Sequence, residues 1–270
     1  MTAAHISILL AVGAGAGFTS GLLGVGGGFI MVPVSYWVIL AMGVSPDIAI
    51  RIAFGTSLLV ILPTAISGTM AHSKKRAVRW KTASIWGSCA LVGALLGALL
   101  AARLPGRVLE AGFGGLVLAV ALWMGLGVVP RVAKETGQPR GDPGLAAACG
   151  FPVGMVTGLT GLGGGVLNVP LLVLVLNFPM HTAVGTSVAA IILASLGGIV
   201  GYIVTGLGTP DLPPHSIGYI NLAIGLSLVA TSIPLAQLGA RAAHALPAKQ
   251  LRYILVAFMV YAGLRMIGAF

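Results

Sequence analysis

The sequence predicts an all-α polytopic membrane protein made of two inverted repeats of about five hydrophobic helices each. Glycine-broken short helices are expected to meet near the bilayer centre. Apolar residues make up 57% of the 270 residues, charged residues make up 7%, and the mean hydropathy is +1.05. A soluble chain of this length cannot bury so much apolar surface, so most of it must lie in lipid. In addition, a glycine-rich motif occurs twice, and basic residues are distributed unequally between the loops of the two halves.

Apolar runs bounded by proline, glycine or charge predict ten segments. We expect all of them to be helical, because backbone that faces lipid must form its own hydrogen bonds. The second and seventh are shorter than the about 20 residues that a full span needs. Each is therefore either a short span or part of a half-helix hairpin with the segment before it. The segments are 5–23, 29–42, 48–71, 80–102 and 109–129, then 144–159, 166–178, 181–207, 217–239 and 251–270.

The glycine run at 24–28, which reads GVGGG, is repeated as GLGGG at 161–165. Each run is followed by Val-Pro, at 32–33 and 169–170. Glycine disfavours a helix interior by about 1 kcal/mol relative to alanine. One interpretation is a loop, or close packing of small residues between membrane helices. The other is a helix break at membrane depth, whose freed N–H groups face a bound anion.

The similarity of the two halves continues beyond the glycine runs. Residues 53–57, AFGTS, are echoed by 183–187, AVGTS, and residues 102–107 are echoed loosely by 240–249. Similar motifs in the same order indicate an internal duplication. We therefore divide the chain into a first membrane repeat at 1–129, a cytoplasmic linker at 130–143 and a second, inverted membrane repeat at 144–270.

Charge indicates that the second repeat is inverted. The loop at 74–81 carries five Lys and Arg residues, whereas the equivalent loop at 208–216 carries none. Cytoplasmic loops of membrane proteins are enriched in Lys and Arg, so these two loops are expected on opposite sides. Arg103 and Arg107 then lie on the minority side, and both termini lie outside. The predicted cytoplasmic loops, which hold eleven of the fifteen basic residues, are 74–81, 131–140 and 241–252.

The net charge of +10 does not indicate nucleic-acid binding, because the basic residues lie in loops beside apolar segments. Membrane lipid is the expected partner instead. Cys89 and Cys149 form no metal-ligand cluster, and the sequence has no HExxH, GxSxG or P-loop motif. We predict no enzyme activity, cofactor or metal site. With five acidic residues, mostly in loops, the expected cargo is an anion.

Charged and polar residues at the segment starts are further candidates. Arg51, four residues after Asp47, is either an interfacial ion-pair partner or a cation that faces an anionic substrate. His181 corresponds to Arg51 and is either interfacial or a proton carrier. Asn168 replaces the Met31 of the first half, as an asymmetric ligand or a packing contact between helices would. Four tryptophans near segment ends are expected in an interfacial belt, namely Trp37, Trp80, Trp86 and Trp123.

The Thr-Ser pairs at 56–57 and 186–187 follow a glycine within apolar segments. Such hydroxyls either bond helix carbonyls or contribute to a site. The full set of candidate substrate-binding residues is Gly24, Gly26, Gly27, Gly28, Thr56, Ser57, Gly161, Gly163, Gly164, Gly165, Asn168, Thr186 and Ser187, with Arg51 and His181 as candidates for anion or proton coupling.

The GLLGVGGG and GLTGLGGG stretches, the two GTS elements and the paired ARLP-type loops together resemble the TauE/SafE sulfite exporter family, also called the toluene-sulfonate uptake permease family. The similarity covers essentially the whole chain. It implies a bacterial or archaeal plasma-membrane permease for sulfur-containing anions. It also implies that the glycine runs and the Thr-Ser pairs form the site. The chain lacks cysteines near these motifs, unlike the relatives that take up thiosulfate through cysteine-bearing sites.

The resulting hypothesis is a secondary transporter that exports sulfite or a small organosulfonate by alternating access, with the proton as a candidate coupling ion. An importer of sulfonate or thiosulfate and a passive anion channel are the alternatives. A membrane anchor or sensor has little support, because no soluble domain is present. The sequence leaves oligomeric state open, including a homo-oligomer.

Overall fold

The computed structural model of the chain describes residues 2–24, 26–125, 142–242 and 248–269. The predicted linker at 130–143 lies largely outside these residues, the loop at 131–140 lies entirely outside them, and the loop at 241–252 lies partly outside them. The elements are α1 (Ala3–Leu23), α2 (Gly28–Ala41), α3 (Pro46–Lys74), α4 (Trp80–Ala101), α5 (Gly106–Gly125), α6 (Pro143–Thr160), α7 (Gly165–Leu174), α8 (Met180–Gly206), β1 (Ser216–Ile217), β2 (Ile220–Asn221), α9 (Leu222–Ala242) and α10 (Ala248–Met266).

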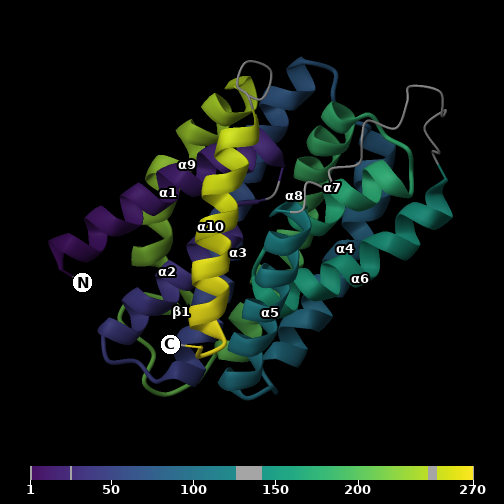
Figure 1. The fold of residues 1–270 in the computed structure, drawn as a ribbon. Helices are drawn as coiled ribbons and strands as arrows, with labels where there is room; N and C mark the ends of the chain where they lie inside the picture. The colour runs from purple at the N-terminus through teal and green to yellow at the C-terminus, as the bar shows by residue number, and fades with distance from the viewer. Residues whose placement is uncertain (1, 25, 126–141, 243–247, 270) are drawn as a thin grey trace.

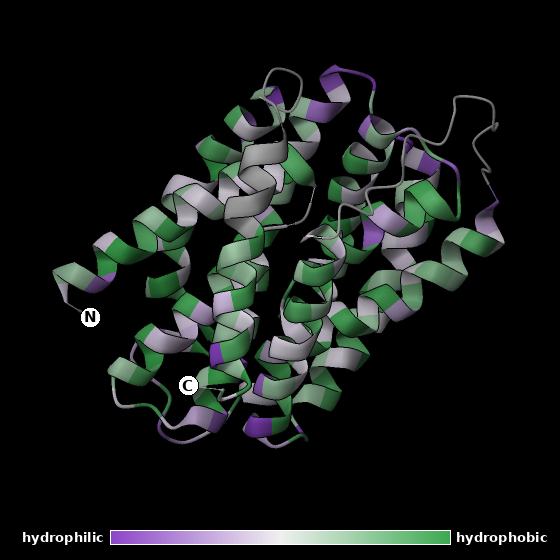
Figure 2. Cartoon of the chain, in the orientation of Figure 1, coloured by the Kyte–Doolittle hydropathy of each residue, from purple (hydrophilic) through white to green (hydrophobic). Residues whose placement is uncertain are grey.

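The described part of the chain is helical almost throughout, and its ten helices confirm the all-α fold class (Figure 1). Seven of these helices are long and apolar enough to cross a membrane, namely α1, α3, α4, α5, α6, α8 and α9. Figure 2 shows apolar residues along the helices and hydrophilic residues gathered mainly near the ends of the bundle. The chain is a multi-pass membrane protein.

The two short helices that the sequence predicts are α2 and α7. They contain 14 and 10 residues, fewer than the about 20 residues that cross a bilayer. The helices before them, α1 and α6, contain 21 and 18 residues and qualify as spans. Each half therefore begins with a span-length helix, a glycine break, and a helix too short to cross alone.

The predicted helix at 217–239 is wrong at its start. Strands β1 and β2 pair there as an antiparallel ribbon, and α9 begins only at Leu222. Asn221 sets this boundary, because its Oδ1 accepts a hydrogen bond from the N–H of Ile224 at 3.0 Å. Asparagine favours the N-cap position because its side chain can satisfy a free N–H group of the first turn. Apolar composition alone does not reveal such a cap.

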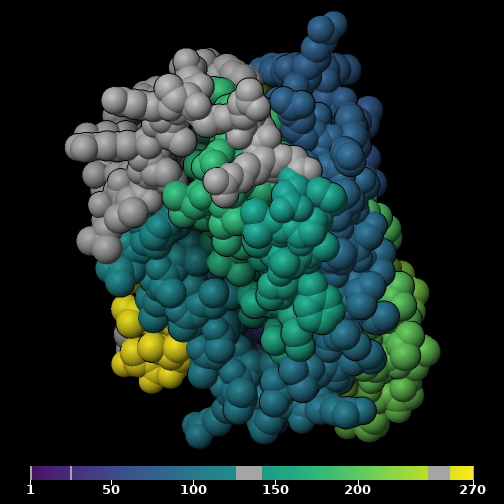
Figure 3. Space-filling view, turned by 90° about the vertical axis from the view of Figure 1, so that its right-hand side faces the viewer, coloured from purple at the N-terminus to yellow at the C-terminus, as the bar shows by residue number. Residues whose placement is uncertain are grey.

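Helices from the two halves pack against each other. Helix α1 packs on α9, and α4 packs on α6; Figure 3 shows α6 lying against α4. Glycines at every fourth position let such backbones approach closely in a membrane. The glycines that face the partner backbone are Gly13, Gly17 and Gly21 in α1, and Gly150, Gly154 and Gly158 in α6. Close packing of small residues, one interpretation of the glycine runs, is thus found in the helices that precede the runs.

Replacing Gly17 by leucine is expected to destabilise the protein, whereas Gly15→Leu should be tolerated. A Cβ on Gly17 would meet the backbone of Ser232 in α9, but a Cβ on the exposed Gly15 would meet nothing within 4 Å. Overpacking typically costs about 1–3 kcal/mol, so the unfolding temperature of the Gly17 variant in detergent should fall by roughly 5 °C. Equal unfolding temperatures for the two variants would contradict this packing.

Helices α3 and α8 cross at the centre of the molecule and run in opposite directions. A Cβ on Gly68 of α3 would lie 3.2 Å from Val188 of α8, and a Cβ on Gly198 of α8 would contact Leu58 of α3. The ends of the two helices therefore point to opposite sides. In Figure 1 the blue connection from α3 to α4 lies at the top, and β1, which follows α8, lies near the bottom. Corresponding helices of an inverted repeat are related in this way.

Candidate functional site

Both glycine runs break the chain between two helices. A left-handed backbone strains any residue that carries a Cβ, so these positions require glycine. Gly28 and Gly165 then begin α2 and α7. The left-handed residues are Gly24, Gly26 and Gly27 in the first break and Gly161, Gly163 and Gly164 in the second, with φ between 66° and 85°.

The two breaks touch each other. A Cβ on Gly28, the first residue of α2, would lie 2.7 Å from the carbonyl oxygen of Gly161 and 2.8 Å from the Cα of Leu162. A Cβ on Gly26 would lie 3.3 Å from the carbonyl oxygen of Leu162. The glycines that the sequence places in two separate halves are thus brought to one place in the fold.

Among the residues that the structure describes, the first backbone N–H groups of each short helix make no hydrogen bond. In α2 the first N–H group bonded within the helix belongs to Ile30, which donates to the carbonyl of Gly27 at 3.1 Å. In α7 it belongs to Leu167, which donates to Gly164 at 3.0 Å. Neither N-cap residue has a side chain that could accept from the free N–H groups. Uncapped helix N-termini of this kind attract anions.

Ser57 and Ser187 tie each break to the opposite half. The hydroxyl of Ser57 in α3 lies within hydrogen-bonding distance of two carbonyl oxygens, that of Gly161 at 2.6 Å and that of Phe54 at 2.9 Å. Ser187 of α8 donates to the carbonyl of Gly24 at 3.1 Å. Both serines are completely buried. The two hydroxyls donate to carbonyls at the ends of α1 and α6. The serines therefore position the breaks.

Removing both serine hydroxyls is expected to loosen the breaks. Each hydrogen bond contributes about 1 kcal/mol, and the two bonds use different partners, so Ser57→Ala and Ser187→Ala should have additive effects. The unfolding temperature of the double variant in detergent should fall by roughly 5 °C, more than that of either single variant. Ser84→Ala is the control, because Ser84 is exposed and bonds only the carbonyl of Lys81 in its own helix. A double variant that behaves like this control would contradict the positioning role.

Thr56 and Thr186 make a second reciprocal pair of contacts. The hydroxyl oxygen of Thr56 accepts from the N–H of Asn221 at 2.9 Å, and that of Thr186 accepts from the N–H of Arg79 at 3.1 Å. Asn221 lies between α8 and α9, and Arg79 lies between α3 and α4. Each threonine therefore secures the connection that follows the central helix of the other half, and both are completely buried.

Asn168 lies in the first turns of α7, and its amide Oδ1 accepts a hydrogen bond from the indole Nε1–H of Trp86 at 2.8 Å. The two side chains are 2% and 1% exposed. The prediction that Trp86 belongs to an interfacial belt is therefore wrong. A buried indole needs an acceptor, and Asn168 supplies it; the 58% exposed Trp80 nearby does fit an interfacial position.

Arg51 and Asp47 lie together at the start of α3. The Arg51 guanidinium donates to the backbone carbonyls of Asp47, Ala101 and Leu104, at distances from 2.8 to 3.4 Å. The carboxylate of Asp47 accepts from the N–H of Gly106, which begins α5. Arg51 thus holds the carbonyls at the end of α4, and Asp47 holds the start of α5. His181 is exposed in the first turn of α8.

Two buried polar contacts beside the breaks escape sequence reasoning. His72 of α3 lies with its Nε2 3.2 Å from the carbonyl oxygen of Gly21, and the Tyr202 hydroxyl of α8 donates to the carbonyl of Gly158 at 2.7 Å. Gly21 and Gly158 occupy matching places in α1 and α6. His72 and Tyr202 are different residue types, so comparing the sequences of the two halves does not reveal that they correspond. An alignment that matches Ser57 with Ser187 nevertheless places His72 opposite Tyr202.

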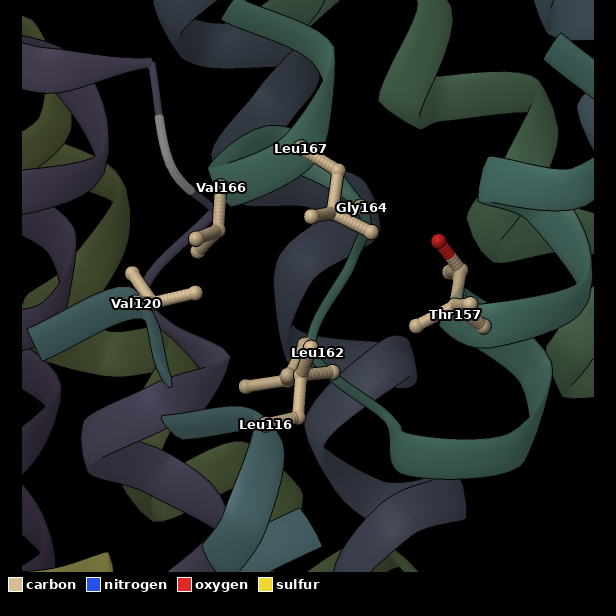
Figure 4. Close-up of a pocket in the computed structure, with 8 residues that line it drawn as sticks. Leu116, Val120, Thr157, Leu162, Gly164, Val166 and Leu167 are labelled. Carbon is tan, nitrogen blue, oxygen red and sulfur yellow. The ribbon is translucent and has the colours of Figure 1, made fainter. Parts of the chain in front are cut away.

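A small cavity lies between the second break and α5 (Figure 4). Its volume is about 10 Å³, room for about one water molecule. Leu116 and Val120 of α5 close one side, and Figure 4 shows the hydroxyl of Thr157 directed toward Gly164. The remaining lining residues are Val156, Leu162, Gly164, Val166 and Leu167. The cavity is therefore too small, in this conformation, for an anion of several heavy atoms.

Comparison with known proteins identifies the family of the chain. Residues 9–266 match the family model described as sulfite exporter TauE/SafE. A probable membrane transporter protein of Haemophilus influenzae is 30% identical over 262 residues, which cover 97% of each chain. A probable membrane transporter protein of Methanocaldococcus jannaschii is 28% identical, over 97% of this chain and 95% of the relative.

No solved structure gives a significant match. The family match extends over nearly the whole chain and includes both glycine breaks and both central helices. The chain therefore belongs to the sulfite exporter TauE/SafE family of membrane transporters.

Proposed function

We propose that this transporter exports sulfite or a small organosulfonate by alternating access and catalyses no chemical reaction. The observation that carries the proposal is the contact between the two glycine breaks, each of which leads into an uncapped helix N-terminus, at one place between the halves of the chain. The description of the matching family supports a sulfur oxyanion as the substrate. The printed names of the relatives specify only membrane transport.

The chemistry of the breaks suits such an anion. Backbone N–H groups donate hydrogen bonds and carry partial positive charge at a helix start. They lack the full counter-charge that would hold an anion too tightly for release. The described residues place no Lys or Arg side chain within the contacts of either break. The Arg51 guanidinium already donates to three carbonyls, so we assign anion binding to the glycines and Asn168. We assign the positioning of the breaks to the Thr-Ser pairs, and we keep Arg51 and His181 as candidates for coupling.

Alternating access requires the breaks to become open to one side at a time. We propose that α5 moves away from α7 on one side, which releases Leu116 and Val120 from the small cavity, and that α10 makes the corresponding movement on the other. The inverted arrangement of α3 and α8 supports this scheme, because related motions of the two halves then open opposite sides. The loop at 74–81 is proposed to be cytoplasmic, in a bacterial or archaeal plasma membrane.

Sulfite flux into proteoliposomes, with and without an imposed pH gradient, tests the proposal. Saturable flux that follows the gradient is the expected result. Unitary currents without saturation would instead identify a channel. If sulfite is not transported but organosulfonates bind tightly, the proposed anion site is supported and the substrate is an organosulfonate instead of sulfite.

A further inference from the structure

The orientation of the Asn168 side chain is determined by Trp86. An asparagine amide presents an acceptor on one side and two donors on the other, and it can turn about its last torsion. The indole N–H of Trp86 is only a donor, so the oxygen of Asn168 must face it, as the 2.8 Å bond requires. The NH₂ group is then directed away from Trp86.

The NH₂ group of Asn168 lies beside the second glycine break. Its Nδ2 is 3.8 Å from where a Cβ of Gly164, the N-cap of α7, would be. None of the hydrogen bonds among the described residues uses this nitrogen, although the side chain is only 2% exposed. The nitrogen is not fully enclosed by the surrounding protein atoms, so it remains accessible to an added acceptor. Its two protons add to the donors of the uncapped α7 N-terminus, and together they match a bound oxyanion.

The other half of the chain has an apolar pair in the corresponding place. Gly13 of α1 contacts Leu228, as Gly150 of α6 contacts Trp86, so Leu228 corresponds to Trp86. Met31 corresponds to Asn168, and both Leu228 and Met31 are completely buried. The donor pair is therefore confined to one break, because the corresponding positions of the other half are buried without polar side-chain atoms.

We propose that Trp86 is a positioning residue that gives the site its selectivity for anions, by keeping the donor side of Asn168 toward the substrate. This inference rests on the proposed function, because it assumes an oxyanion at the breaks. Without the indole N–H, the amide is free to present its oxygen, which repels an anion and accepts from a neutral sulfonamide.

The test is calorimetric binding of two isosteric probes, methanesulfonate and methanesulfonamide, to the purified full chain. The variants are Trp86→Phe and Asn168→Asp, with Trp80→Phe as the matched control on the exposed tryptophan of the same helix. Trp86→Phe should raise the Kd of methanesulfonate about tenfold and leave that of methanesulfonamide equal or lower. Asn168→Asp, which keeps the side-chain volume, should weaken methanesulfonate binding even more. The double variant should add nothing to Asn168→Asp alone.

An unchanged ratio of the two Kd values in Trp86→Phe would overturn the inference, whether both constants stay the same or both rise equally. In that case binding by the unaltered protein leaves the proposed function intact. If the unaltered protein binds no methanesulfonate or sulfite, the proposed function fails, and this inference fails with it.

Discussion

Gly164→Leu is expected to abolish anion flux without preventing membrane insertion. Gly164 has a φ of 74°, and its Cβ would lie 2.5 Å from the Thr157 hydroxyl oxygen. The left-handed conformation alone costs a residue with a Cβ about 1–2 kcal/mol, and the steric overlap adds to it. Gly27→Leu should act in the same way, because its Cβ would lie 2.7 Å from the carbonyl of Ala16. Initial sulfite flux per inserted molecule should fall about 100-fold or more in each.

Gly43→Leu is the control for these variants. Gly43 also has a positive φ, 85°, but it lies in the turn between α2 and α3, where a Cβ would meet nothing within 4 Å. It carries the backbone strain without changing the breaks. Normal flux in both the Gly27 and Gly164 variants, or an equal loss in the Gly43 variant, would contradict a site at the breaks.

Asn168→Asp is expected to reduce sulfite flux about 100-fold. The substitution replaces the NH₂ donor beside Gly164 with an oxygen, and an ionised carboxylate there repels the substrate. The indole of Trp86 keeps its acceptor, so the hydrogen bond between Trp86 and residue 168 is retained. The measurement is flux as a function of sulfite concentration, in which the half-saturating concentration should rise.

Asn177→Asp is the matched control, because Asn177 follows α7 at the end away from the break. It introduces the same carboxylate into the same region of the chain. Equal flux in the Asn168 and Asn177 variants would show that the amide at 168 has no part in anion binding.

Much of the fold follows from local patterns. Apolar runs give the ten helices, because lipid requires backbone hydrogen bonds to be made within a helix. The glycine runs give the breaks, because three left-handed residues in each require glycine. By contrast, the N-cap at Asn221 depends on a single side chain in an apolar stretch. The apolar pattern continues across this residue, so it does not predict that a helix begins there.

The contacts between the halves could not be predicted from the sequence. The repeat shows that Ser57 and Ser187 are equivalent, but not that each bonds the break of the opposite half. Trp86 is 82 residues from Asn168, and its position in an apolar segment gives no sign that the indole is buried. Such pairs depend on how α4 and α6 pack, which is a property of the assembled helices.

The most direct test of the account is a crystal structure of the protein with selenite, the selenium analogue of sulfite, located by its anomalous signal. The account predicts a peak between the breaks, within hydrogen-bonding distance of the first N–H groups of α2 and α7 and of Asn168 Nδ2. A peak only on exposed arginines such as Arg103 and Arg107, with none between the breaks, would contradict it.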